Sequence, residues 1–299
     1  MKIRVGIAFT GVGTDDGFDD LLVRLDEAGV DSLWLSELVS ARAPDPIVGL
    51  AYAAARTRTL KLGTGVSVLP GRNPVLFAKQ LATLGRLAPK RILPAVGLGP
   101  AQPSDRDAFP IPAGARRGDV FDEALLVVRR LLAEPSVTFH GRFFHLDDVS
   151  VGEPPVKPLD LWLGGSAPAA LARIGRLGDG WLASLITPDE ARAGIAAIND
   201  AARDAGRTVD QDHFGISLPV ALDGAIPPRL VAAAANRRAA SGPVDPATLI
   251  PVGWDGLRAS IGRYVDAGVT KFVVRAATPP ADQSEFVDRF VHELQGVQT

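Results

Sequence analysis

The sequence lacks cysteine altogether and has only four histidines among its 299 residues. Without cysteine, the chain has no disulfide framework, no thiol nucleophile and no thiolate ligand for a metal. The histidines do not cluster at the spacing of metal ligands, so we expect no metal site. A G-x-S-x-G nucleophile elbow, typical of many serine hydrolases, is also missing. The sequence therefore argues against thiol-dependent and metal-dependent enzymes.

Charge of one sign is equally scarce, because the formal net charge is −2 and the lysines and arginines are scattered along the chain. Such a chain has no basic field for nucleic acid, and we expect no nucleic-acid partner. No apolar run reaches the length of a membrane span, so we expect no membrane partner. The residues MKIRVGIAFT enter a strand directly and lack the pattern of a secretory signal. We expect a cytoplasmic protein whose partner is a small molecule.

What the sequence does contain is a regular alternation of short β-rich runs with longer amphipathic helical patterns. This alternation is typical of repeated βα units around a parallel sheet. Hydrophobic residues make up 46% of the chain, and we expect one domain over residues 1–299. Eight strands are predicted, at Ile3–Phe9, Ser32–Ser36, Leu60–Val68, Ile92–Leu98, Leu161–Gly165, Gly180–Ser184, Phe214–Leu222 and Lys271–Ala276.

Eight strand–helix units favour a (β/α)8 TIM barrel, an α/β fold whose active site lies at the C-terminal ends of its strands. The alternative is a doubly wound open sheet, but GIAFTGVGTDDGF after the first strand lacks the usual G-x-G-x-x-G spacing. Insertions follow the fourth and seventh strands, at Gly99–Gly114 and Asp223–Gly253. We expect lids or substrate walls there, because both follow strand ends on the active face. A small hairpin over Val137–Val151, turning at Gly141, is predicted after the fourth helix.

The turn after the fifth strand reads GGSAP and is a candidate anion site. Gly164 and Gly165 leave the backbone open, Ser166 is predicted to cap the next helix, and Pro168 lies near its first position. A helix N-terminus with free N–H groups suits a phosphate. The alternative is a strand-to-helix turn that binds nothing.

The third strand is followed by PGRNP, where Asn73 and Pro74 predict the start of a helix. Gly63 and Gly65 then lie near the mouth of the barrel. A glycine there allows a flat ligand to approach the backbone, or allows a bulge. A bend in the barrel wall without any ligand is the alternative.

Two charged residues are predicted at strand ends. Glu37 follows the second strand and is a candidate acid or base, although a solvated loop carboxylate is the commoner case. Arg275 ends the eighth strand and is suited either to a phosphate or carboxylate ligand, or to an ion pair between strands.

Taken together, these residues resemble the bacterial luciferase-like superfamily of flavin-dependent oxidoreductases. The matching stretches cover most of the chain and include EAGVDSLWLSE, DPIVGLAYAAARTRTLKLGTGVSVLPGRNPVLFAKQLATLGRL, FDEALLVVRRLL, FHGRFFHLDDV, LWLGGSAPAALARIGRLGDGW and YVDAGVTKFVVR. Within the superfamily, LWLSELV, PGRNPVL and HGRFFHLDDV resemble a subgroup that uses the deazaflavin coenzyme F420 instead of FMN.

The resemblance implies a barrel that binds its cofactor at the C-terminal mouth and commonly forms a homo-oligomer. The ring would rest on a bulge at Gly65–Val66, preceded by Thr64 and often formed in this superfamily by a non-proline cis peptide. The backbone around Gly97 and Gly99 would also face the cofactor. Gly164, Gly165 and Ser166 would hold its phosphate.

The sequence departs from its relatives where they supply polar groups. Leu38 stands where many relatives have a histidine, and Leu98 and Pro100 offer no side-chain proton. Glu37 is left as the candidate acid or base. Hydride transfer depends chiefly on a well-placed cofactor and can survive the loss of these groups, so the F420-dependent oxidoreductase that the resemblance implies is still expected. An FMN-dependent monooxygenase, or a barrel that binds a flavin or ligand without turnover, is the alternative.

Overall fold

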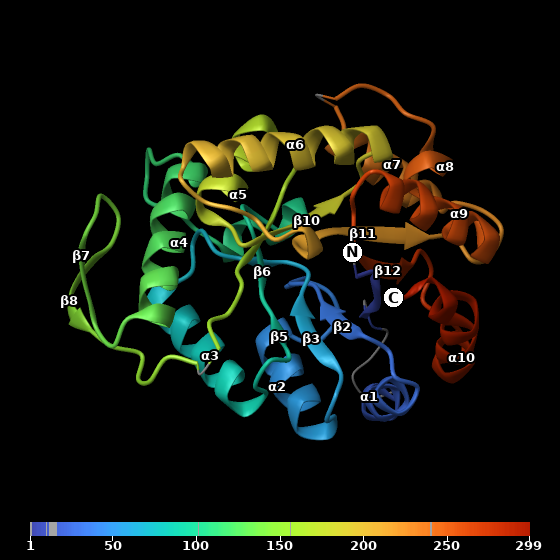
Figure 1. Ribbon diagram of the computed structural model, residues 1–299, viewed down its shortest axis with the longest axis horizontal. Coiled ribbons are helices and arrows are strands. Elements are labelled where there is room, and N and C mark those ends of the chain that lie inside the picture. The colour runs from blue at the N-terminus through green and yellow to red at the C-terminus, as the bar shows by residue number, and fades with distance from the viewer. Residues whose placement is uncertain (1, 10, 12–16, 101, 156, 240) are drawn as a thin grey trace.

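The computed structural model describes residues 2–9, 11, 17–100, 102–155, 157–239 and 241–299. A curled, parallel, ten-stranded sheet forms the centre, and helices surround it (Figure 1). The strands of this sheet are β1 Arg4–Phe9, β2 Ser32–Leu35, β3 Lys61–Thr64, β4 Ser67–Val68, β5 Ile92–Leu93, β6 Ala95–Gly97, β9 Trp162–Gly164, β10 Gly180–Ser184, β11 Phe214–Val220 and β12 Lys271–Ala276.

The two ends of the sheet consist of parts of the same two predicted strands. Hydrogen-bonded neighbours run in the order β4-β6-β9-β10-β11-β12-β1-β2-β3-β5. The predicted third strand is divided into β3 and β4 at Gly65–Val66, and the predicted fourth into β5 and β6 at Pro94, which has no N–H to donate. The expectation of two unbroken strands was therefore wrong. The sheet nevertheless curls until one end, formed by β4 and β6, meets the other end, formed by β3 and β5.

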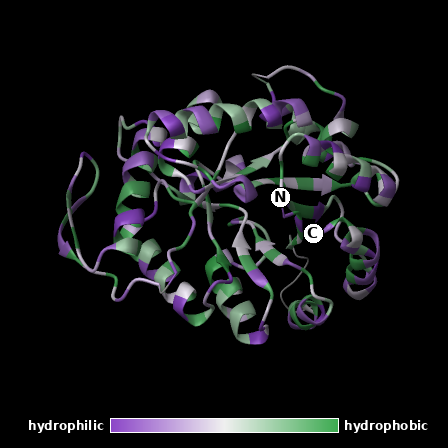
Figure 2. Cartoon of the chain, in the orientation of Figure 1, coloured by the Kyte–Doolittle hydropathy of each residue, from purple (hydrophilic) through white to green (hydrophobic). Residues whose placement is uncertain are grey.

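The helices follow the strands in the expected alternation. They are α1 Phe18–Glu27, α2 Pro46–Arg56, α3 Pro74–Leu87, α4 Arg117–Ala133, α5 Pro168–Leu177, α6 Pro188–Asp204, α7 Pro228–Arg237, α8 Pro246–Leu249, α9 Gly253–Asp266 and α10 Gln283–Leu294, with 3-10 turns η1 Pro103–Ala108, η2 Gln211–His213 and η3 Gln295–Val297. Hydrophobic and hydrophilic residues alternate along these helices, as expected when one helix face is buried (Figure 2).

The start of α3 confirms a prediction made from local sequence. The Asn73 side-chain oxygen accepts hydrogen bonds from the N–H groups of Val75 at 2.9 Å and Leu76 at 3.1 Å. Pro74 occupies the first helical position, where its missing N–H costs nothing. Cap and proline together end the loop after β4 at a defined point.

Apolar side chains pack in two main layers. The larger cluster lies between the strands and the surrounding helices. A second cluster contains Trp34, Trp162, Leu182 and Val273, with the two indole rings 6.5 Å apart. These residues come from β2, β9, β10 and β12, which are spread around the curled sheet. Their side chains therefore fill the space that the curled sheet encloses. The interior is therefore a packed core, and any ligand site is confined to its open end.

The N-terminal ends of the strands are held by a group of charges. Asp31, directly before β2, forms ion pairs with Lys271 of β12 and with Lys61 of β3, the latter at 3.1 Å. Arg4 of β1 lies 3.7 Å from the same carboxylate. One buried carboxylate therefore connects three strands at the end of the sheet opposite the candidate site.

The predicted hairpin is present as β7 Val137–His140 and β8 His145–Val149, which pair antiparallel. Its turn begins at Gly141, whose N–H donates to the carbonyl of Phe144 at 2.9 Å. Glu123 of α4 accepts the N–H of Phe144 at 2.7 Å and so fastens the turn to that helix. The hairpin projects from the side of the molecule, away from the sheet (Figure 1). Within the described ranges, no helix combines the length and apolar character needed to cross a membrane.

Candidate functional site

The C-terminal ends of β3, β6 and β9 bring several of the predicted residues together around one side chain, Val66, which lies in the link between β3 and β4. A methyl group added to Gly97 would lie 2.5 Å from Cγ2 of Val66. A methyl group added to Gly164 would lie 3.4 Å from Cγ1. Val66 therefore lies between these two glycines, and a side chain at Gly97 would collide with it.

The Gly65–Val66 peptide bond is cis, which the resemblance led us to expect. Gly63, two residues earlier, was suggested to let a flat ligand approach the backbone at the mouth of the barrel, but it has a different role. A methyl group there would lie 2.4 Å from the ring of Trp34, so Gly63 makes room for a core side chain. Of the two glycines, only Gly65 has space beside it, with Trp34 3.6 Å from an added methyl.

The peptide groups on both sides of Val66 are held by β2 and the residues that follow it. The Ser36 hydroxyl donates to the carbonyl oxygen of Gly65 at 2.8 Å. The Glu37 N–H donates to the carbonyl oxygen of Val66 at 3.3 Å. Thr64, predicted to contact a cofactor, uses its hydroxyl within the sheet, donating to the Ala95 carbonyl at 2.6 Å and accepting its N–H at 2.9 Å. The Thr64 side chain therefore joins β3 to β6.

The side chain of Glu37 is engaged on both oxygens. The residue is only 7% exposed. One oxygen accepts the N–H of Val68 at 2.6 Å, and the other forms an ion pair with Arg72. Arg72 also donates through Nε to the Val68 carbonyl at 3.1 Å. The role of Glu37 as an acid or base stays a prediction, but its surroundings are those of a residue that holds backbone in place.

The Gly164–Ser166 turn lies at the exposed start of α5. Gly165 has φ of +114°, a conformation that favours glycine. Its carbonyl accepts a 2.7 Å hydrogen bond from Nε1 of Trp181 in β10. Ser166 was expected to cap the helix, but the cap position is Ala167, which has no side-chain hydrogen bond to give. That prediction was wrong by one residue, and the first helical N–H groups are left without a side-chain cap.

Helices α4 and α5 begin beside one another at the same end of the sheet. Arg173 of α5 forms an ion pair with Asp122 of α4, which ties the two helices together. At the start of α4, the stem of Arg117 passes Gly99, with its Cδ 3.9 Å from an added methyl. The Arg117 guanidinium donates to the Phe109 carbonyl at 2.8 Å. Arg117 therefore anchors the insertion after β6, and a methyl group at Gly99 would make only an ordinary contact with it.

Three arginines gather near the ends of β10 and β12. Burial, together with the nearby charges of Arg229 and Arg237, lowers the pKa of Arg275. Arg229 donates to the Ala277 carbonyl at 3.1 Å. Arg237 lies 3.5 Å from the Ser184 hydroxyl. Among the described residues, none gives Arg275 a hydrogen bond or a counter-charge, so the predicted ion pair between strands is not found there.

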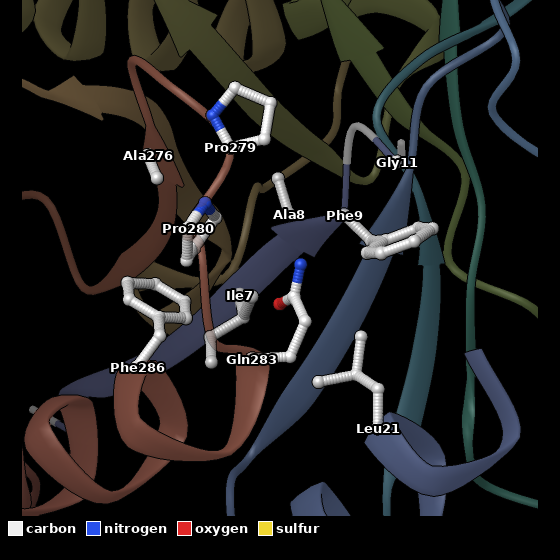
Figure 3. A pocket seen from close by; sticks show the side chains of 10 residues that line it. All are labelled: Ile7, Ala8, Phe9, Gly11, Leu21, Ala276, Pro279, Pro280, Gln283 and Phe286. Atoms are coloured by element: carbon white, nitrogen blue, oxygen red, sulfur yellow. The ribbon is translucent and has the colours of Figure 1, made fainter. Parts of the chain in front are cut away.

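A small pocket lies beside the mouth, between the ends of β1 and β12 and the start of α10 (Figure 3). Phe9, Leu21 and Phe286 give it an apolar lining, and the Gln283 amide points into it. No predicted cofactor residue lines this pocket. It is separate from the seat around Val66 and carries no part of the candidate site.

At the positions where the resemblance implies polar groups, the side chains of this chain offer no proton. Leu38 is half-buried after β2, and Leu98 is 41% exposed at the end of β6. In the part of the chain that the structure describes, no three histidine or carboxylate side chains are grouped so as to hold a metal ion. Sequence reasoning missed Ser36, Arg72 and Trp181, whose roles depend on partners far away in the chain.

The curled parallel sheet with surrounding helices is the fold of TIM-barrel oxidoreductases in solved structures. An F420-dependent secondary alcohol dehydrogenase, solved with an F420–acetone adduct, superposes with a TM-score of 0.82 at 21% identity and full coverage of both chains. A type II Baeyer–Villiger monooxygenase from Pseudomonas putida, solved with FMN, gives a TM-score of 0.75 at 18% identity, covering 100% of this chain and 99% of the other.

The sequence profile of the luciferase-like monooxygenase family matches residues 15–265, and the chain belongs to this family. It is 28% identical to an F420-dependent glucose-6-phosphate dehydrogenase of Kineococcus radiotolerans, over 91% of this chain and 89% of that protein. A protein of the same name from Beutenbergia cavernae is 27% identical, over 91% and 90%.

Proposed function

We propose that the chain is an oxidoreductase that uses coenzyme F420 to transfer a hydride to or from a small anionic substrate. One observation carries the proposal: a glycine-lined seat around Val66 lies at the same end of the sheet as the uncapped start of α5. A planar ring joined to a phosphate needs these two features side by side. The names of the relatives from Kineococcus and Beutenbergia support the choice of F420.

The residues present fit such a cofactor. At the seat, Gly65 leaves the backbone open, and Gly97 leaves room for the Val66 side chain, which would support the ring. At the turn, Gly165 and Ser166 are exposed, and the first turn of α5 carries no acidic residue that would repel a phosphate. When bound, the deazaflavin supplies the carbon that gives or receives the hydride. The chain's own residues bind and orient it and keep water from one face.

Proton transfer is the step for which the described residues offer least. Leu38 and Leu98 have no exchangeable proton, and both Glu37 oxygens are engaged. We therefore propose that the chain contributes chiefly by placing cofactor and substrate against each other, which by itself provides a large part of a rate enhancement.

The arginines near β12 support an anionic substrate. Arg275 is half-buried, and a partly desolvated guanidinium beside two more cations is costly unless an anion joins them. A phosphate or carboxylate accepts paired hydrogen bonds from a guanidinium, so Arg275 with Arg229 and Arg237 is suited to such a group. The relatives named for glucose 6-phosphate support this choice of substrate class.

The two insertions are proposed as walls of the substrate space. The first, Gly99–Gly114, is fastened: Asp105, 3% exposed, accepts the N–H of Val39 at 3.0 Å. The second, Asp223–Gly253, carries Arg229 and Arg237 on α7 toward the ends of the strands. We propose a fixed wall at the first and a substrate-contacting wall at the second.

Cofactor titration tests the proposal. Purified protein is titrated with F420 and separately with FMN, following the fluorescence of each. We expect saturable binding of F420 and none of FMN over the same range. Tight FMN binding without F420 binding would instead favour the FMN-dependent monooxygenase. F420 binding without redox exchange across a panel of sugar phosphates and carboxylates would favour a binding barrel without turnover.

A charge placed at the turn separates specific from adventitious binding. Ser166→Asp puts a carboxylate where the cofactor phosphate is proposed to lie, and we expect ~10-fold or greater loss of F420 affinity, as like charges at a helix start repel. Ser284→Asp is the matched control, because Ser284 lies in the exposed first turn of α10. Equal losses in both variants would contradict the proposed phosphate position.

The homo-oligomer expected by resemblance also remains a proposal. Exposed apolar side chains lie on two adjacent helices, with Val48 and Tyr52 on α2 and Leu76 and Leu87 on α3. Such side chains favour an interface between copies. Light scattering of Val48→Glu and wild-type protein tests this, with a smaller mass expected for the variant.

A further inference from the structure

We infer that Glu37 and Arg72 act as a positioning pair that fixes the backbone of the ring seat, and that Glu37 does not act as an acid or base. The inference rests on the proposed function, because it takes Gly65–Val66 as the seat of the cofactor ring. It is carried by the hydrogen bonds on both sides of the seat and by the burial of the carboxylate.

The pair holds Val68 from both sides of its backbone. Its N–H donates to one Glu37 oxygen at 2.6 Å, and its carbonyl accepts from Nε of Arg72 at 3.1 Å. The other Glu37 oxygen forms the ion pair with Arg72, which closes a ring of contacts around one residue. Val68 lies two residues after Val66 of the seat. A shift of the Glu37–Arg72 pair would therefore move the backbone of the seat as well.

The two residues that follow β2 also hold the seat. Ser36 donates its hydroxyl to the Gly65 carbonyl at 2.8 Å, and the Glu37 N–H donates to the Val66 carbonyl at 3.3 Å. Glu37 therefore contacts the segment twice, through its backbone and through its side chain. The carbonyls of both residues of the seat are fixed before any ligand binds.

The same contacts make Glu37 a poor proton carrier. Moving a proton to or from a reacting atom requires a free oxygen in the open site. Glu37 has neither oxygen free, and the side chain turns toward Val68 and Arg72. Protonating it would also break the ion pair and leave Arg72 without its counter-charge in a half-buried position.

Arg72 also connects the seat to the insertion after β6. Its guanidinium carbon lies 5.3 Å from the ring centre of Phe77 in α3 and 6.0 Å from that of Phe109. Phe109 belongs to the wall segment Gly99–Gly114. The adjacent Gly71 is packed so closely that an added methyl would lie 2.5 Å from the Phe109 backbone. Arg72 therefore links the ring seat to the wall segment Gly99–Gly114.

Glu37→Gln tests the role, because glutamine keeps an acceptor for Val68 but loses the ion pair. F420 affinity is measured by fluorescence titration, and kcat/KM is measured from pH 5 to pH 9 with the substrate found in the panel. We expect about a 10-fold weaker F420 affinity, the size of a lost charge-assisted contact, a changed absorbance spectrum of bound F420, and a pH profile of unchanged shape. Arg72→Lys keeps the positive charge, so we expect its F420 affinity to lie between that of Glu37→Gln and that of the wild type.

Glu190→Gln is the matched control, since Glu190 pairs with the buried Arg238 away from the seat. It should lower thermal stability and leave F420 affinity unchanged. Unchanged F420 affinity in Glu37→Gln, with loss of one limb of the pH profile, would overturn the inference and restore the acid or base role. Wild-type protein that fails to bind F420 would contradict the proposed function instead. If Glu37→Gln does not fold, Arg72→Lys and Arg72→Met carry the same comparison.

Discussion

The Nε1–H of Trp181 in β10 donates a 2.7 Å hydrogen bond to the carbonyl oxygen of Gly165, in the middle of the proposed phosphate turn. The indole is otherwise buried, and its ring packs against Gly194 of α6, where an added methyl would lie 2.5 Å away. A core side chain therefore fixes the orientation of the exposed turn that is proposed to hold the phosphate.

Trp181→Phe should loosen this turn while keeping most of the packing. The lost hydrogen bond is expected to lower the free energy of unfolding by about 1 kcal/mol, beyond the smaller loss from the reduced ring. F420 affinity should fall, whereas the affinity for a deazaflavin core that lacks the phosphate should not. Titration with both compounds checks this, and equal losses for the two would indicate a general packing defect.

Gly97→Ala is expected to disturb the ring seat. The new methyl would lie 2.5 Å from the Val66 side chain, so Val66 must move out of its place beside Gly164. We expect weaker F420 binding and about 1–3 kcal/mol loss of stability. Gly262→Ala provides the control, because Gly262 lies inside α9 with nothing within 4 Å, and alanine favours a helix. That control should be as stable as the wild type or more so; similar losses in both variants would contradict the crowding argument.

Arg275→Met should remove the proposed anion contact without weakening the fold. Because Arg275 is half-buried and lies near the charges of Arg229 and Arg237, its loss relieves repulsion, and the ligand-free variant should melt at the same temperature or higher. With F420 already bound at its own phosphate site, inorganic phosphate should raise the melting temperature of the wild type but not of Arg275→Met. Stabilisation of both by phosphate to the same degree would place the anion elsewhere.

Ionisation of Asp26 makes the stability of the fold depend on pH in the acid range. Burial opposes ionisation of this carboxyl, but hydrogen bonds from the backbone of Arg58, Thr59 and Leu60 and from the Thr59 hydroxyl lower its pKa from 3.8 to about 2. A lowered pKa stabilises the folded state above about pH 4, and this contribution is lost as pH falls toward 2.

Asp26→Asn removes that contribution. At pH 7 we expect a loss on the order of 1 kcal/mol, reduced by solvent screening at this partly exposed site. The difference from the wild type should shrink as pH falls from 4 to 2. Urea unfolding at several pH values measures it, with Asp20→Asn on the exposed face of α1 as the control. A difference that stays constant down to pH 2 would contradict the assignment.

Local chemistry explains why much of the fold could be predicted. The strands β10 and β12 begin and end where the apolar runs begin and end, and α3 starts at its Asn73 cap. These features depend on residues within a few positions of one another. The cap of α5 shows the limit, because Ser166 and Ala167 are adjacent and only the path of the turn decides which one lies at the helix start.

By itself, the sequence determined the alternation of strands and helices, the glycines at the strand ends and the absence of thiol chemistry, since these follow from residue type and near neighbours. Only the tertiary structure decided what the charged residues do. Glu37 meets Arg72 from 35 positions away, and the distance between them in space depends on how β2 and β4 lie in the sheet. A carboxylate at a strand end is a candidate acid in sequence, but the partners that the fold brings to it decide whether a proton can leave.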